Sequence, residues 1–188
     1  NDGPALRGIM MIKIINIFKY NYDILINKLI CPIIIKDINY LIENYDKISF
    51  DLWEEKKGWH FYTRMVQLKF LKDTLSINKY LKLKEELLSK IKEVVHNLYV
   101  SLEDHISEND DGKYIISSFD QGGKIIKYED SANLLAYCHI DYDKEIIKKI
   151  PLEYTTHTSK NLLSYFSKKY NDPENICIVL NYQFYLPL

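Results

Sequence analysis

The chain is 188 residues long, and 47% of its residues are hydrophobic and 13% aromatic. This composition allows a sizeable buried core and argues against an intrinsically disordered chain. The 25 Lys and Arg residues are balanced by 26 Asp and Glu residues, so the net charge of -1 does not favour a nucleic acid as partner.

Helical periodicity dominates the first eighty residues. A first helix is expected to begin at Gly3 and Pro4, because proline suits the first turn and the apolar residues that follow share one face. A second helix is expected over about residues 23–45, kinked or split at Pro32, which lacks an amide donor. A third covers about residues 60–77, with two rows of apolar side chains that indicate burial on more than one side.

The rest of the chain is also predicted to be mainly helical. A fourth helix over about residues 79–107 carries an apolar stripe at near-heptad spacing, which fits either an amphipathic helix packed on one side or a coiled coil. A turn at residues 109–112 precedes a short strand or extended loop at 113–119, and helices follow at about 131–137 and 159–170. Successive helices with almost no strand signal predict an all-α fold, either a bundle or part of an α/α toroid.

The connection between the second and third helices concentrates acidic and aromatic side chains. Asp51, Trp53, Glu54 and Glu55 lie within five residues of one another. Neighbouring carboxylates resist simultaneous ionisation and an apolar indole face disfavours the charged form, so one carboxyl is expected to hold a proton near neutral pH. Glycoside hydrolysis uses such a carboxyl together with a second carboxylate, and Trp53 and Trp59 suit the apolar faces of sugar rings. Solvated surface or helix caps are the plainer interpretation of the same acidic residues.

The order of the residues favours the first interpretation. The segment Asp51-Leu52-Trp53-Glu54-Glu55-x-x-Gly58, followed by His60-Phe61-Tyr62-Thr63 and Val66-Gln67, resembles the active-site signature of the yeast-type glucoamylases, family 15 of the glycoside hydrolases. Two further stretches resemble the family in the right order: Asn1-Asp2-Gly3-Pro4-Ala5-Leu6-Arg7 before it, and Asp130-Ser131-Ala132-Asn133-Leu134-Leu135 with His139-Ile140-Asp141 after it. The resemblance extends to about residue 170.

This resemblance implies an (α/α)6 toroid and an exo-acting, inverting hydrolysis of α-1,4 and, more slowly, α-1,6 glucosidic bonds of starch or glycogen. Glu54 matches the proton donor of the family, Glu55 matches a substrate-binding carboxylate, and Trp53 helps to shape the sugar pocket. Asp51 falls on a position associated with the proton acceptor. Inversion needs carboxyl groups roughly 6.5 to 9.5 Å apart to admit a water, so Asp51 is expected to support or orient the site rather than to act as the base.

The sequence departs from the family pattern towards both ends and at one position near the motif. The family's Trp-Thr-Arg-Asp and Gly-Arg-Tyr-Pro-Glu-Asp segments are absent, the late base glutamate has no candidate, and Ser49 stands where a glycine is common. Residues 1–170 are therefore expected to be a piece of the glucoamylase catalytic domain truncated at both ends, and residues 171–188 a divergent tail. Such a chain is expected to be inactive alone; the alternative is a noncatalytic helical or glucan-binding remnant.

The expected partner is an α-glucan, bound by a monomer without cofactor or metal. Cys31, Cys138 and Cys177 are odd in number and far apart, which argues against a disulfide framework, and the five histidines lack zinc-ligand spacing. His60 is expected to cap the third helix or to line the sugar pocket, and Arg7 to form a structural ion pair or a contact with a backbone carbonyl. No apolar stretch reaches about 18 residues, so no membrane span is expected. The parent protein is expected to be vacuolar or secreted.

Overall fold

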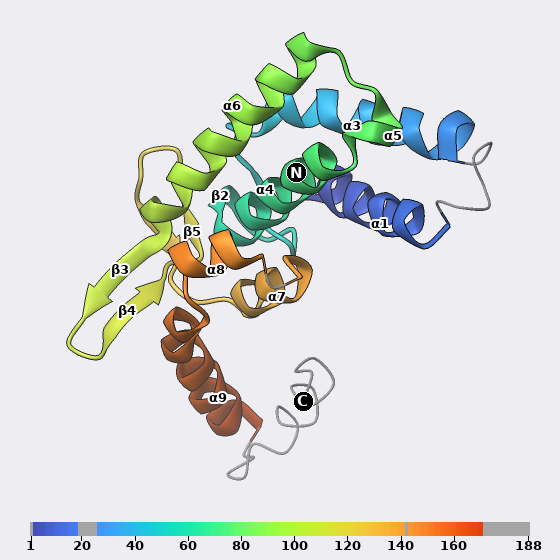
Figure 1. Cartoon of the computed structure of the whole chain (residues 1–188). Helices are drawn as coiled ribbons and strands as arrows, with labels where there is room; N and C mark the ends of the chain where they lie inside the picture. The colour runs from blue at the N-terminus through green and yellow to red at the C-terminus, as the bar shows by residue number, and fades with distance from the viewer. Residues whose placement is uncertain (1, 19–25, 142, 171–188) are drawn as a thin grey trace.

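The computed structural model describes residues 2–18, 26–141 and 143–170, and most of them are helical (Figure 1). The helices are α1 (Gly3–Phe18), the π-helix η1 (Ile26–Ile30), α3 (Cys31–Asn44), α4 (Phe61–Ser76), α5 (Asn78–Leu81), α6 (Glu85–Ser101), the 3-10 helix η2 (Leu102–His105), α7 (Ser131–His139), α8 (Lys144–Lys149), the 3-10 helix η3 (Leu152–Thr155) and α9 (Thr156–Tyr170). None of these described helices is both long and apolar enough to cross a bilayer. The predicted tail, residues 171–188, lies outside the described residues.

Helix α4 is the centre of the core. Of its 16 residues, 11 are buried, so it is covered on more than one side, as its two apolar rows predict. Helices α1, α6 and α7 all pack against it, and Figure 1 shows α4 between α1 and α6. The rings of Phe61, its first residue, and of Phe70, past its middle, are fully buried. The third predicted helix is therefore confirmed, and it carries the segment that follows the acidic motif.

The second predicted helix is interrupted near Pro32, as expected. Residues Ile26–Ile30 form a π-helix and Cys31–Asn44 an α-helix, with Pro32 in the first turn of the latter. Proline is tolerated there because the first amides of a helix have no intrahelical acceptor. Residues 23–25, where this helix was expected to begin, lie outside the described residues.

The fourth predicted helix is interrupted near its start, and its last turn is a 3-10 helix. Helix α5 ends at Lys82, whose backbone is left-handed with φ of 51°, and the side chain of Asn78 accepts from the amide of Leu83 at 3.0 Å. Helix α6 therefore begins only at Glu85, and after the 3-10 turn of η2 the chain is already extended at Ile106. The predicted single apolar stripe is present, because Ile91, Val94 and Leu98 are the buried residues of α6.

Two small antiparallel sheets correct the expectation of almost no strands. Their members are β1 (Ser49–Phe50), β2 (Lys57–His60), β3 (Ile106–Asn109), β4 (Gly112–Ile115), β5 (Ser118–Phe119) and β6 (Ile125–Lys127). Strands β3 and β4 form a hairpin across the predicted turn, with Asn109 opposite Gly112. The other sheet has the order β1-β2-β5-β6, and it holds the acidic motif between β1 and β2.

Candidate active site

The acidic motif forms a tight loop, residues 51–56, which we call the acid loop. Strands β1 and β2 pair on either side of it, with Phe50 opposite Lys57. The amide of Asp51 donates to the carbonyl of Lys56 at 2.9 Å, and the amide of Glu54 donates to the carbonyl of Asp51 at 3.0 Å. The loop is thus a closed turn fixed by the sheet rather than a free connection between helices.

Asp51 is the buried anchor of the acid loop. One carboxylate oxygen accepts the amides of Glu55 at 2.7 Å and Lys56 at 3.3 Å, and the other accepts the ammonium of Lys127 at 2.8 Å. Burial alone would raise the pKa of Asp51, but these three donors outweigh it and the pKa is lowered. Asp51 is therefore an ionised residue that orients the loop, and the neutral carboxyl expected in this segment is not Asp51.

Glu54 projects from the acid loop into solvent. Its backbone is left-handed, with φ of 58°, a conformation that costs energy in a residue with a side chain and persists only where the surroundings impose it. Among the described residues, its carboxylate has no hydrogen-bond or ion-pair partner, and the residue is exposed. Glu54 is therefore not paired with a cation or held by a donor among these residues.

Trp53 is held by a carboxylate from a distant segment. Its indole Nε1 donates to Asp130 Oδ1 at 2.7 Å, although 47% of the residue remains exposed. Asp130 is buried and is the N-cap of α7, where the same oxygen accepts the amide of Ala132 at 2.8 Å. The indole is thus fixed at its polar edge while part of its apolar surface faces solvent.

Lys127 joins these residues into one cluster. Its ammonium contacts Asp51 at 2.8 Å, Asp130 at 2.8 Å and Glu55 at 3.3 Å, and we call these four residues the Lys127 cluster. Sequence reasoning missed both Lys127 and the role of Asp130. Asp130 begins the third matched stretch and its N-cap chemistry was readable, but nothing in the sequence indicates that Lys127 meets Asp51.

A family model places the chain among known proteins. The model for glycosyl hydrolases family 15 matches residues 1–182. The chain belongs to this family. The intracellular sporulation-specific glucoamylase of Saccharomyces cerevisiae is 38% identical over 84 residues, which cover 40% of this chain and 15% of that protein. The glucoamylase of Blastobotrys adeninivorans is 40% identical over 82 residues, which cover 38% of this chain and 13% of that protein.

A solved structure is similar as well. The glucoamylase from Saccharomycopsis fibuligera matches with a TM-score of 0.53 and 28% identity, over 63% of this chain and 27% of that one. The family 15 chain thus matches only a minor part of the length of these relatives. The resemblance read from the acidic motif is confirmed at the level of the family.

The aromatic and histidine neighbours of the acid loop serve the packing of this family 15 chain. Trp59 Nε1 donates to the carbonyl of Asp46 at 3.1 Å, and the guanidinium of Arg64 lies 5.8 Å from its ring centre. Both indole N–H groups are therefore bonded within the chain, but Trp59 is less exposed than Trp53.

His60 takes neither of its two expected roles. It is the N-cap of α4 by position, but its side chain makes no capping bond, and with 3% exposure it cannot form a solvent-facing wall. Its Nε2 contacts the carbonyl of Ser49 at 2.9 Å, which can only accept, so Nδ1 is left to accept the hydroxyl of Ser118 at 2.7 Å. His60 therefore ties β1 and β5 to β2, and burial lowers its pKa.

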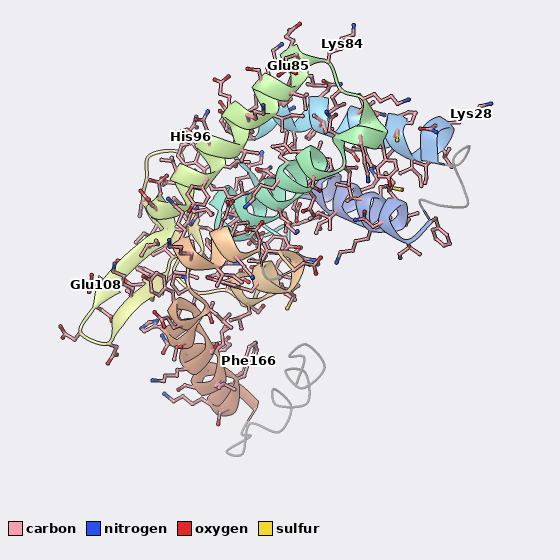
Figure 2. All side chains as sticks on the ribbon, viewed as in Figure 1. Lys28, Lys84, Glu85, His96, Glu108 and Phe166 are labelled. Carbon is pink, nitrogen blue, oxygen red and sulfur yellow. The ribbon has the colours of Figure 1, made fainter. Side chains whose placement is uncertain are left out.

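The remaining sequence candidates are structural. Arg7 forms two hydrogen bonds to the buried Asp37 of α3, at 2.9 and 2.5 Å, which confirms its predicted ion pair. Within the described ranges, no three His, Cys, Asp or Glu side chains gather as metal ligands, and His96 lies on the outer face of α6 (Figure 2).

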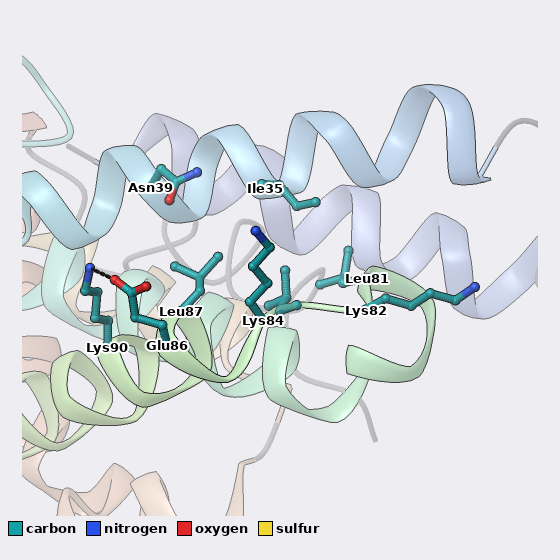
Figure 3. Close-up of a pocket in the computed structure, with 9 residues that line it drawn as sticks. Ile35, Asn39, Leu81, Lys82, Lys84, Glu86, Leu87 and Lys90 are labelled. Atoms are coloured by element: carbon teal, nitrogen blue, oxygen red, sulfur yellow. Dashed lines mark hydrogen bonds and ion pairs between the residues drawn. The ribbon is translucent and has the colours of Figure 1, made fainter.

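A surface pocket lies away from the acid loop. It opens between α3 and the connection from α5 to α6, where Ile35, Leu81 and Leu87 supply its apolar wall and Lys84 reaches towards α3 (Figure 3). None of the four predicted site residues lines it. The catalytic roles of Glu54 and Asp51 and the substrate-binding roles of Glu55 and Trp53 remain predictions.

Proposed function

We propose that this family 15 chain carries the proton-donor segment of a glucan 1,4-α-glucosidase, an exo-acting enzyme that releases glucose from starch or glycogen with inversion. The observation that carries the proposal is the family match over residues 1–182, which contains the whole acid loop. The names of the curated relatives, all glucoamylases, support the substrate class. The likeness to the Saccharomycopsis fibuligera structure supports an (α/α)6 toroid to which α1, α3, α4 and α6 contribute helices.

In this proposal the four predicted residues divide the work. Glu54 gives its proton to the glycosidic oxygen, Glu55 hydrogen-bonds sugar hydroxyls, and Trp53 offers its exposed ring to the apolar face of a sugar. Asp51 orients the loop, since its oxygens are already engaged by two amides and Lys127. A base that activates water needs a free carboxylate on the opposite side of the sugar ring, so Asp51 does not fill that role.

The same argument leads us to propose that the 188 residues are inactive alone. Glu54 stands exposed, and the pocket between α3 and the α5–α6 connection is lined by none of the predicted site carboxylates. Inverting hydrolysis needs both carboxyl groups, roughly 6.5 to 9.5 Å apart, in one site. A lone proton donor can bind and orient a sugar without cleaving it.

The test combines a binding measurement with an activity measurement. The ¹⁵N-labelled chain is titrated with acarbose, and glucose release from maltose and soluble starch is measured on the same preparation. We expect shifts of the Trp53 indole and of the Glu54 and Glu55 amides, weakened in Glu54→Gln, and no glucose release. The control is Glu108→Gln, which changes an exposed carboxylate on the β3–β4 hairpin, apart from the acid loop (Figure 2).

Each outcome bears on a different part of the proposal. Glucose release that disappears in Glu54→Gln would show that the chain is active alone. Acarbose shifts of equal size in the wild type and in Glu54→Gln, without turnover, would favour a noncatalytic glucan-binding protein. Absence of any shift at Trp53, Glu54 and Glu55 would remove the support for a sugar site on the acid loop.

A further inference from the structure

We propose that Lys127 is a positioning residue for the sugar site, which sets the direction of the Trp53 ring and the shape of the acid loop. This role rests on the function proposed above. The motif that resembles the family's signature ends at residue 67, so Lys127 lies 60 residues beyond it. The observation behind the proposal is the Lys127 cluster.

The geometry of the cluster matches the donors of an ammonium group. Lys127 Nζ carries three N–H donors, and it has three carboxylate acceptors: Asp51 Oδ2 at 2.8 Å, Asp130 Oδ2 at 2.8 Å and Glu55 Oε2 at 3.3 Å. The side chains of Asp51 and Asp130 are each 5% exposed and that of Lys127 is 19% exposed. Two of the three contacts are therefore shielded from water, and charge-assisted hydrogen bonds are strongest when they are shielded in this way.

Asp51 and Asp130 each use their second oxygen to hold a part of the predicted site. Asp130 uses its other oxygen to accept the indole of Trp53 at 2.7 Å. Asp51 uses its other oxygen to accept the amide of Glu55 at 2.7 Å, next to the left-handed backbone of Glu54. Lys127 thus acts on the ring and on the acid loop through two separate carboxylates.

Charge balance makes Lys127 hard to replace. Asp51 and Asp130 are both acidic and buried, and each contacts Lys127, so its removal would leave two carboxylates together without a compensating cation. Burial lowers the pKa of Lys127, but the bonds to Asp130 and Asp51 outweigh burial and the pKa is raised. Lys127 therefore stays charged at neutral and acidic pH.

His60 is a titratable group close to this cluster. Its pKa is lowered by burial and is influenced in opposite directions by the charges of Asp51 and Lys127. Its ring nitrogens contact Ser49 and Ser118, so it offers no replacement for the ammonium.

The experiment follows the Trp53 indole N–H by NMR in the full chain, as a function of pH from 4 to 8. The second tryptophan, Trp59, bonds to a backbone carbonyl and serves as an internal reference. In the wild type we expect one Trp53 signal with little dependence on pH. In Lys127→Met we expect the signal to move towards that of a water-exposed indole and to titrate with a carboxyl group, while Trp59 stays in place.

Two further variants separate positioning from general stability. Lys127→Arg keeps the charge and is expected to restore a pH-insensitive Trp53 signal, and Lys56→Met removes an exposed lysine of the same loop and is expected to leave it unchanged. If Lys127→Met does not fold, Lys127→Gln takes its place, because it removes the charge that compensates the two buried carboxylates while it keeps a polar side chain in the cluster. A folded Met or Gln variant with the wild-type Trp53 signal and pH response would overturn the proposal.

Acarbose distinguishes this inference from the proposed function. We expect Lys127→Met to weaken acarbose binding about tenfold, the size of one lost charge-assisted hydrogen bond. Unchanged affinity in a variant whose indole has moved would overturn the role in sugar binding. If the wild type does not bind acarbose, the proposed function fails, and the role of Lys127 in sugar binding fails with it. The indole signal would then still show whether Lys127 orders the loop.

Discussion

Gly58→Ala should break the packing behind the acid loop. A Cβ at Gly58 would lie 2.2 Å from the carbonyl oxygen of Phe119 and 2.8 Å from Ile126 Cδ1, whereas ordinary contacts begin at 3.4 Å. The Ile126 side chain can rotate, but the carbonyl belongs to β5, so β2 and β5 must separate by about 1 Å, the shortfall between these distances.

The expected cost follows from two opposing effects. Overpacking costs about 1–3 kcal/mol, and weakening of the hydrogen bonds between β2 and β5 adds about 1 kcal/mol. Replacement of glycine lowers the conformational entropy of the unfolded chain, which stabilises the folded state by about 0.4–1 kcal/mol. We therefore expect the free energy of unfolding to fall by about 2–3 kcal/mol.

Urea denaturation followed by tryptophan fluorescence and far-UV circular dichroism measures this loss. The control is Gly122→Ala, where the new Cβ would meet only Asp120 Oδ1 at 3.4 Å, and its stability should stay within about 0.5 kcal/mol of the wild type. A Gly58→Ala variant as stable as this control would refute the reasoning, because it would show that β2 and β5 are not in the close contact described.

Two further predictions concern the core. Gly8→Ala would place a methyl 2.1 Å from the buried ring of Phe70, so we expect the free energy of unfolding, measured by urea denaturation, to fall by about 1–2 kcal/mol after the gain in helix propensity. Gly3→Ala is the control, because a Cβ there has nothing within 4 Å and should cost no stability. Equal urea midpoints for the two variants would contradict this. Burial lowers the pKa of His105 from 6.5 to about 3, so as the pH falls through 6.5 the unfolded chain takes up this proton first and stability is lost. Between pH 7 and pH 4 this group lowers the free energy of unfolding by about 3 kcal/mol. In His105→Gln the free energy of unfolding should therefore fall less steeply as the pH is lowered. An equal dependence on pH in the wild type and the variant would count against the buried neutral ring.

Periodicity was sufficient for the helices that bury a defined face. The apolar rows of α4 and the stripe of α6 appear in the sequence at helical spacing, and both are buried as expected. Strands β4 and β5 overlap the segment 113–119, which was predicted as a short strand or extended loop. The other strands were missed because the longest have four residues, too few for an alternating pattern, and β2 is stabilised by a partner far along the chain, as in Trp59 opposite Phe119. The last two residues of the fourth predicted helix, 106 and 107, belong instead to β3, which pairs with β4.

The sequence by itself determined the family, because the order of acidic, aromatic and glycine residues in the acid loop is a local pattern that needs no partner. It also indicated the helices that bury a defined apolar face, such as α4 and α6, since their burial repeats with the helical period. Only the tertiary structure decided how the acidic residues differ. Lys127 and Asp130 come to the loop from more than 70 residues away, and their contacts make Asp51 a buried anion and fix Trp53, while Glu54 is left free towards solvent. Charge and hydrogen bonding act through distances in space, and no spacing along the chain encodes those distances.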